Sequence, residues 1–334
     1  MKENALLNVE ELTASFTTES GRLPAVENVS FHIDPGEALG LVGESGCGKS
    51  VTALSIMRLL PRPAGRIDRG RVRLGDTDLT SLPAERMRTF RGSRLAMVFQ
   101  EPMTALNPVH SIGKQLREAF RLHEHITDKR LADGKAVNLL RQVGIPDPER
   151  RLKEFPHQIS GGMRQRVMIA MALACDPELL IADEPTTALD VTIQAQILDL
   201  IKAQQQKRGL SLLLITHDLG VIAETCDRVC VMYAGRIVET ADVVTLFARP
   251  AHPYTRGLLA SIPRLEGQRK SRLTVIPGMV PALSELPPGC RFQNRCPQAR
   301  DICRDREPPD ITVADGHAAA CFFAGPEKEL HETR

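Results

Sequence analysis

The feature that most constrains the fold of this chain is a glycine-rich stretch with the pattern G-x-x-x-x-G-K-[ST]. It reads GESGCGKS over residues 43–50 and follows an apolar run, Ala38 to Val42, that is typical of a buried strand. A helix-compatible segment from about Lys49 to Leu60 comes next and is bounded by Pro61. This order of strand, loop and helix is the setting in which backbone N–H groups and a helix N-terminus bind phosphate. The sequence therefore predicts a nucleoside triphosphate site.

Each part of this loop has an expected task. Lys49 is expected to contact the outer phosphates and Ser50 to hold Mg²⁺, while the glycines let the backbone turn toward the anion. Cys47 is interpreted as a tolerated small residue and not as a redox switch. The residues of this segment expected to bind the nucleoside triphosphate are Gly43, Glu44, Ser45, Gly46, Cys47, Gly48, Lys49, Ser50 and Val51.

Three further polar residues follow two other apolar runs. Asp183 and Glu184 come directly after Leu179–Ala182, and His217 comes directly after Ser211–Thr216. Because the carboxyl ends of parallel strands meet at one edge of a sheet, these side chains are predicted beside the phosphates. Asp183 is expected to bind Mg²⁺, directly or through water, and Glu184 to polarise the attacking water. His217 is expected near the γ-phosphate, although a histidine at a strand end is usually structural.

Strands alternate with helices along most of the chain, which predicts a mainly parallel α/β sheet. A polar, helix-compatible stretch from about Glu101 to Phe155 indicates an inserted helical subdomain. Another helix is predicted from Val191 to Gly209. From about Ala251 the chain becomes rich in Pro and Arg, so a linker is predicted near Leu265–Arg272, with a small cysteine-bearing module after it.

Composition excludes several classes of protein. The net charge is +2, aromatic residues make up 4% and there is no Trp, so no nucleic acid is expected as a partner. No apolar run approaches the ~20 residues of a membrane-spanning helix. The first residues mix charges and lack the apolar stretch of a signal peptide. We therefore expect a cytoplasmic chain whose membrane association is at most peripheral.

A second glycine-rich stretch, ISGGMRQR at residues 159–166, begins another predicted helix and is a second candidate anion site. It resembles the LSGGQ signature of ABC ATPases, with Ile159 in the place of Leu and Met163 in the place of Gln. Ile is a mild exchange, whereas Met163 lacks the side-chain amide of Gln. The resemblance implies that the signature of one subunit closes over ATP held by another. The residues concerned are Ser160, Gly161, Gly162 and Met163.

Other motifs of the ABC ATPases occur in the family's order. Gln100 is similar to the Q-loop glutamine, which senses the γ-phosphate and Mg²⁺ and relays to the membrane subunit. Ala188-Leu189-Asp190 is similar to the D-loop that crosses the dimer interface. Phe16 lies where the family places an aromatic residue on adenine; the alternative is a core residue of a β-subdomain. The resemblance thus implies the catalytic residues Glu184, His217 and Gln100, a Mg²⁺ site of Ser50, Gln100 and Asp183, and the D-loop residue Asp190.

Longer matches extend over nearly the whole chain. The stretches 99–108, 156–163 and 252–255, together with the cysteine-bearing tail, resemble the ATPases of dipeptide and oligopeptide importers, most of all the D-type subunits of dipeptide permeases. The resemblance implies an ATPase that lies at the cytoplasmic face of the bacterial inner membrane and drives the import of peptides across it. Nickel, glutathione and murein peptides are the alternative cargoes. The implied partners are a second, related ATPase subunit, two transmembrane permease subunits and, indirectly, a periplasmic substrate-binding protein.

Two other classes compete with a transport ATPase. Non-transport ABC ATPases that act on DNA or ribosomes usually carry a long coiled coil, zinc inserts or two cassettes, and this chain has one cassette and no heptad run. A regulatory or redox-sensing module that only binds ATP is opposed by the presence of Glu184 and His217.

Four cysteines crowd into the tail of the chain. They are Cys290, Cys296, Cys303 and Cys321, separated by five, six and seventeen residues. On spacing alone they could hold Zn²⁺ or an iron–sulfur cluster, or stay free thiols. The resemblance to dipeptide importers implies a [4Fe–4S] cluster with these four ligands. The neighbouring Arg291, Arg295 and Arg300 are interpreted as solvated, or as an offset to the negative charge of a cluster.

The expected fold is α/β: a RecA-like P-loop NTPase core with an antiparallel β-subdomain and an inserted helical subdomain, plus a small Cys-rich C-terminal module. Residues 1–250 are expected to form the ATPase domain, with the helical subdomain at about 101–175, and residues 251–334 the C-terminal module. The expected cofactors are ATP, Mg²⁺ and the [4Fe–4S] cluster.

Overall fold

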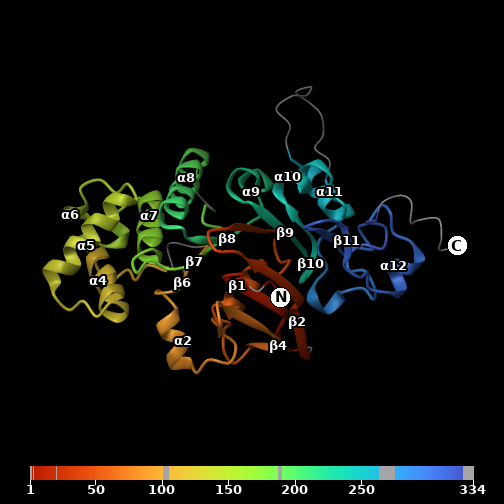
Figure 1. Cartoon of the computed structure of the whole chain (residues 1–334), viewed down its shortest axis with the longest axis horizontal. Coiled ribbons are helices and arrows are strands. Elements are labelled where there is room, and N and C mark those ends of the chain that lie inside the picture. The colour runs from red at the N-terminus through yellow and green to blue at the C-terminus, as the bar shows by residue number, and fades with distance from the viewer. Residues whose placement is uncertain are drawn as a thin grey trace.

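The structure is a computed structural model that describes residues 2, 4–19, 21–100, 105–186, 190–262 and 275–325. The predicted linker at Leu265–Arg272, the segment Glu101–Thr104, and Ala188 and Leu189 of the D-loop lie outside the described residues. Figure 1 shows two sheets in the middle of the molecule, a group of helices at one end and the C-terminal segment at the other.

A four-stranded antiparallel sheet lies near the N-terminus, in the strand order β2-β1-β4-β5. Its strands are β1 (Leu7–Thr18), β2 (Gly21–Ile33), β4 (Gly65–Leu74) and β5 (Thr77–Asp78). Alternate residues of β2, such as Val29 and Ile33, are fully buried, as expected for a sheet with one face on a core. The predicted antiparallel sheet is confirmed.

The second sheet has eight strands among the described residues, in the order β11-β12-β10-β9-β3-β8-β7-β6. They are β3 (Ala38–Val42), β6 (Leu95–Val98), β7 (Leu179–Asp183), β8 (Ser211–Thr216), β9 (Arg228–Tyr233), β10 (Arg236–Asp242), β11 (Ile311–Ala314) and β12 (His317–Ala319). Five neighbouring strands, β9, β3, β8, β7 and β6, are parallel to one another. The other three, β10, β12 and β11, are antiparallel to their neighbours. The mixed sheet confirms the α/β class.

The parallel strands are buried on both faces, which explains why they read as continuous apolar runs. In β3, Leu39 and Leu41 pack into the core shared with the antiparallel sheet. Ala38 and Val42, which point the other way, pack into the core shared with the helical end of the molecule. Because successive side chains of β3 point to opposite faces of the sheet, this one strand contributes to both hydrophobic cores.

Helices cover the sheets and form the helical end. They are α1 (Lys49–Ile56), α2 (Ala84–Phe90), α4 (Ile112–His123), α5 (Lys129–Gln142), α6 (Pro148–Arg151), α7 (Gly161–Ala172), α8 (Val191–Arg208), α9 (Leu219–Thr225), α10 (Val243–Ala248), α11 (Pro253–Ala260) and α12 (Asp301–Asp305), with 3-10 turns η1 (Pro156–Gln158) and η2 (Leu283–Glu285). Helices α4 to α7 lie together at one end (Figure 1), where an inserted helical subdomain was expected. Of the helices in the described ranges, none is long and apolar enough to span a membrane.

Helix α1 is shorter than the sequence predicts. It ends at Ile56 and not at Leu60, because Arg58 adopts a left-handed backbone conformation with φ of 52°. Helix α8 ends as predicted, with Gly209 in the left-handed conformation at φ of 64°.

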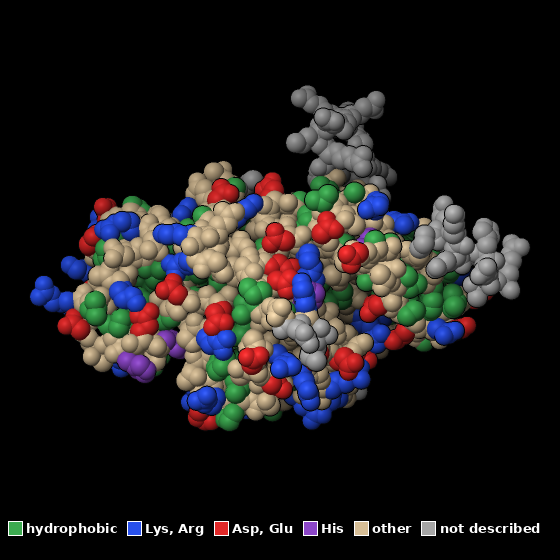
Figure 2. Space-filling model, in the orientation of Figure 1, with side chains coloured by type: hydrophobic (Ala, Val, Ile, Leu, Met, Phe, Trp, Pro, Cys, Tyr) green, Lys and Arg blue, Asp and Glu red, His purple; other side chains and the backbone are tan. Residues whose placement is uncertain are grey.

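The C-terminal segment is joined to the main sheet. Strand β12 pairs antiparallel with β10, with Glu239 opposite Ala319, and β11 lies on its outer side. The division of the chain at residue 250 stays a prediction, but the sheet crosses that position because β10 precedes it and β12 follows it. Figure 2 shows cationic and anionic side chains interspersed over one face of the molecule, which agrees with the net charge of +2.

Candidate nucleotide-binding and catalytic site

The glycine-rich loop turns sharply between β3 and α1. A Cβ atom on Gly43 would lie 2.2 Å from the carbonyl oxygen of Met232, so the close approach of the β9 backbone requires glycine here. Gly48 caps α1 with φ of 109°, a conformation that side chains disfavour. Ser45 and Gly46 are exposed at the tip of the loop, whereas Cys47 is buried beneath it.

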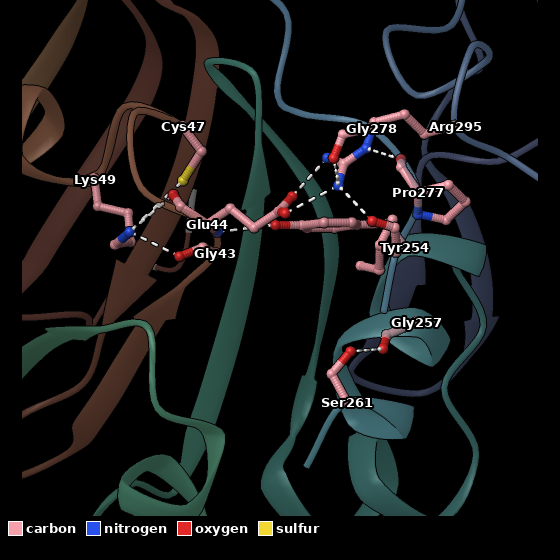
Figure 3. A network of polar contacts seen from close by, with 11 residues as sticks. Gly43, Glu44, Cys47, Lys49, Tyr254, Gly257, Ser261, Pro277, Gly278 and Arg295 are labelled. Atoms are coloured by element: carbon pink, nitrogen blue, oxygen red, sulfur yellow. Dashed lines mark hydrogen bonds and ion pairs between the residues drawn. The ribbon is translucent and has the colours of Figure 1, made fainter. Parts of the chain in front are cut away.

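Lys49 is buried and lies inside its own loop. Its Nζ atom donates to the carbonyl oxygens of Gly43 at 2.8 Å and Glu44 at 3.1 Å, as Figure 3 shows. Burial raises the pKa of the Cys47 thiol, which lies 3.9 Å from Nζ. The loop therefore presents one ammonium group and a helix N-terminus at the same place, which suits a polyphosphate.

The two residues predicted to bind Mg²⁺ from separate parts of the chain are in contact. Ser50 Oγ in α1 donates to Oδ1 of Asp183, at the end of β7, at 3.1 Å. Burial raises the pKa of Asp183, and the hydrogen bond from Ser50 opposes this shift. A hydroxyl and a carboxylate side by side are hard oxygen donors of the kind that Mg²⁺ prefers.

Glu184 brings together the three residues predicted to be catalytic. Its Oε2 accepts a hydrogen bond from Gln100 Nε2 at 2.9 Å, and its Oε1 lies 3.5 Å from His217 Nδ1. These residues follow β7, β6 and β8, which are neighbours in the sheet, so their carboxyl ends meet at one edge as expected. Glu184 has φ of 46°, a strained conformation held by its N–H bond to Ile215 O at 2.9 Å.

The signature segment begins α7. Ser160 is the N-cap of this helix, and its Oγ accepts from the Met163 N–H at 3.4 Å. Gly161 and Gly162 form the first turn, and a Cβ on Gly162 would lie 3.1 Å from Ile193 Cγ2 in α8. The side-chain capping of this turn is intact although Met163 replaces the usual Gln.

Two further predicted residues have local structural contacts. Asp190 caps α8 by accepting from the Ile193 N–H at 3.0 Å. Phe16 lies in β1 opposite Gly65 of β4 and packs against the core of the antiparallel sheet. Stacking of Phe16 on adenine and an interface role for Asp190 stay predictions.

The four tail cysteines gather around one small pocket, together with His252 and Phe292. The Cys290 N–H donates to the carbonyl oxygen of Cys303 at 2.8 Å, which ties two parts of the segment together. Within the described ranges, no three His, Cys, Asp or Glu side chains are placed to hold a single metal ion.

The interpretation of the three arginines near these cysteines as solvated is wrong for two of them. Arg295 and Arg291 have side chains only 5% and 10% exposed, and they pair with Glu44 and Glu27. Arg300 is exposed as expected, and its guanidinium stacks over Phe323 at 4.3 Å from the ring centroid. The correction follows from packing: Arg295 and Arg291 face the core of the cassette, which no local pattern reveals.

A buried glutamine near the signature was also missed. Gln165 is 1% exposed and donates from Nε2 to Pro185 O at 2.5 Å, which links α7 to the turn after Glu184. The available signal was the helical spacing of Gln165 with the apolar Met168 and Ile169, because its direct sequence neighbours are both arginines.

Two regions of the sequence match known families. Residues 26–187 match the family described as ABC transporter. Residues 238–303 match the one described as oligopeptide/dipeptide transporter, C-terminal region. The second match includes the segment that carries Arg295.

Curated relatives align along almost the whole chain. It is 55% identical over 321 residues to a probable peptide ABC transporter ATP-binding protein of Sinorhizobium fredii, covering 96% of both chains. It is 52% identical over 320 residues to the oligopeptide transport ATP-binding protein AppD of Bacillus subtilis, covering 96% of this chain and 97% of that one. It is 51% identical over 319 residues to the dipeptide transport ATP-binding protein DppD of the same species, covering 95% and 94%.

A solved structure shares the fold. A dimeric ATP-binding cassette in a post-hydrolysis state, bound to ADP and Pi, superposes with a TM-score of 0.64 at 24% identity, covering 71% of this chain and 98% of that chain. Fold, phosphate loop and family matches together define an ABC-type ATPase. The chain belongs to the ATP-binding subunits of ABC transporters that carry the oligopeptide/dipeptide transporter C-terminal region.

Proposed function

We propose that this chain hydrolyses ATP to power the import of dipeptides or oligopeptides across the bacterial inner membrane. The observation that carries the proposal is the 51–55% identity, over nearly the full length, to subunits named for peptide, oligopeptide and dipeptide transport. The match to the peptide-transporter C-terminal region supports the same cargo. No comparable observation favours nickel or glutathione.

In the proposed mechanism, Lys49 and the loop N–H groups bind the outer phosphates of ATP. Glu184 accepts a proton from the attacking water, while the Gln100 amide and the His217 ring fix its carboxylate. Ser50, Asp183 and Gln100 supply the oxygen atoms that would hold Mg²⁺. The ion would neutralise charge on the phosphates.

The proposed working unit is a pair of ATPase subunits. Ser160, Gly161, Gly162 and Met163 of one subunit would close over the ATP bound by the other, and Asp190 would lie at their interface. Closure excludes bulk water from the reacting phosphate. The partner ATPase is proposed to be a related but different chain. The helical subdomain would transmit closure to two permease subunits at the cytoplasmic face, with a periplasmic binding protein delivering the peptide.

Cargo can be tested by uptake in cells that lack this chain. Restoring the wild-type chain is expected to restore accumulation of labelled dipeptides and oligopeptides, while uptake of Ni²⁺ and glutathione stays unchanged. Restoration of Ni²⁺ or glutathione uptake with no effect on any peptide would contradict the peptide assignment.

We propose further that the tail forms a Cys-rich module in which Cys290, Cys296, Cys303 and Cys321 hold a [4Fe–4S] cluster. All four thiols border the same pocket, which fits a shared ligand. Among the described residues, no group of His, Cys, Asp or Glu side chains is placed to hold a metal ion. The proposal therefore rests on the shared pocket and on the resemblance of the cysteine tail to that of the dipeptide importers.

Anaerobic purification tests the cluster. The wild-type chain is expected to show broad absorbance near about 400 nm and about four irons per chain. Both should be lost in Cys296→Ser, while Cys175→Ser should keep them because Cys175 lies in the helical end, with Sγ near Ala119 O. A colourless wild-type chain, or one that contains one zinc, would remove the cluster and leave the ATPase assignment unchanged.

A further inference from the structure

The second residue of the phosphate loop, Glu44, is held by side chains from the C-terminal part of the chain. The Arg295 guanidinium pairs with both carboxylate oxygens, at 2.6 Å from Nη1 to Oε2 and 2.9 Å from Nη2 to Oε1. The backbone N–H of Glu44 donates to the Tyr254 hydroxyl at 2.9 Å. Figure 3 shows both contacts converging on Glu44 from the side of the loop opposite Lys49.

Arg295 is itself fixed on every side. Its Nε donates to Pro277 O at 2.8 Å and its Nη2 to Gly278 O at 3.3 Å. Its guanidinium lies 5.7 Å from the ring centroid of Tyr233 and 6.0 Å from that of Phe292. The hydrogen bonds to Glu44 hold the pKa of Arg295 above its ordinary value. A two-pronged ion pair in which the arginine is 5% exposed is stronger than an exposed pair.

Tyr254 provides a second connection to the same residue. It is fully buried at the start of α11, and its N–H donates to His252 Nδ1 at 3.0 Å. His252 is anchored by its own N–H bond to Glu239 Oε2 at 2.9 Å, and its side chain borders the cysteine pocket. Glu44 is thus held by its carboxylate through Arg295 and by its backbone through Tyr254.

These contacts concern the part of the loop that is proposed to contact phosphate. The Glu44 carbonyl accepts from Lys49 Nζ, so a shift of the Glu44 backbone moves a partner of the main cation. We infer that Arg295 is a positioning residue of the phosphate loop, which sets ATP affinity by fixing Glu44 from the cysteine-bearing segment. The inference rests on the proposed role of the loop in binding ATP. Cys296, the next residue, lines the cysteine pocket, so Arg295 and a wall of that pocket belong to the same short segment.

The test measures ATP affinity and turnover in the purified full chain. Arg295→Ala is expected to raise the Kd of ATP about tenfold, because Glu44 loses a charged two-pronged partner, with a smaller effect on kcat at saturating ATP. Arg295→Lys should recover part of the affinity, since lysine keeps the charge but lacks the planar guanidinium that pairs with both carboxylate oxygens of Glu44. Arg141→Ala is the control, because its pair with Glu149 is exposed, and it should bind ATP like the wild type.

A double variant distinguishes positioning from general stabilisation. Because Arg295 acts through Glu44, Glu44→Gln combined with Arg295→Ala should bind ATP no more weakly than Arg295→Ala alone. If Arg295→Ala does not fold, Glu44→Gln alone decides, since it keeps size and removes the charge: a wild-type Kd would overturn the inference. Wild-type affinity in folded Arg295→Ala, or additive effects in the double variant, would also overturn it. Lys49→Ala in the same assay must lose binding; if it does not, the proposed ATP site is itself wrong.

Discussion

Replacing Glu184 with glutamine is expected to leave ATP binding intact and to lower the rate of hydrolysis by at least about a hundredfold. The amide has the size of the carboxylate but cannot accept a proton from water. The side chain can keep its place between Gln100 and His217, which lie 2.9 and 3.5 Å from its two oxygens. The variant should therefore accumulate in a closed state with ATP bound. The two quantities to measure are the steady-state rate of ADP release and the equilibrium affinity for ATP.

Glu149→Gln is the matched control for this experiment. Its side chain is 65% exposed in α6, in the helical end of the molecule, and the same chemical change there should leave hydrolysis at the wild-type rate. Hydrolysis by Glu184→Gln at the wild-type rate would show that another group accepts the proton.

Replacing Lys49 with alanine is expected to weaken ATP binding by about a hundredfold or more. Lys49 is the only cation that residues 43–50 contribute; the residue is 4% exposed, and its ammonium donates to loop carbonyls. Its loss removes charge-assisted hydrogen bonds to phosphate at a site with limited solvent. Nucleotide binding measured by titration with ATP and Mg²⁺ reports the change.

Lys153→Ala removes the same charge from an exposed position after α6 and should bind ATP normally. Near wild-type affinity in Lys49→Ala would mean that the phosphates bind elsewhere. The expected hierarchy is therefore Lys49 for binding, Glu184 for hydrolysis and Arg295 for the fine adjustment of affinity.

Much of the core could be predicted from the sequence because its signals are local. Strands buried on both faces read as apolar runs, so β3 and β8 have the predicted bounds and β7 extends by Asp183 alone. Because parallel strands end at the same edge of a sheet, Asp183, Glu184 and His217 could be placed in one region without knowledge of contacts between distant segments. The contacts of Glu184 with Gln100 and His217 agree with that reasoning.

Contacts between distant segments could not be predicted in this way. Arg295 and Glu44 are 251 positions apart, and an arginine in a Pro-rich tail has the local appearance of a solvated residue. The addition of β12 and β11 beyond β10 in the main sheet was missed for the same reason, since β12 is three residues long and carries no periodic signal. Tertiary packing, not propensity, decides both features.

The most direct test of the account is a transporter reconstituted in vesicles, with ADP release and peptide accumulation measured in the same sample. We predict that a transported peptide and its binding protein raise ADP release, that peptide accumulates in step, and that Glu184→Gln in this chain suppresses both. Peptide accumulation at the wild-type rate with Glu184→Gln, or ATP hydrolysis that never responds to any peptide, would contradict the claim that this chain powers peptide import.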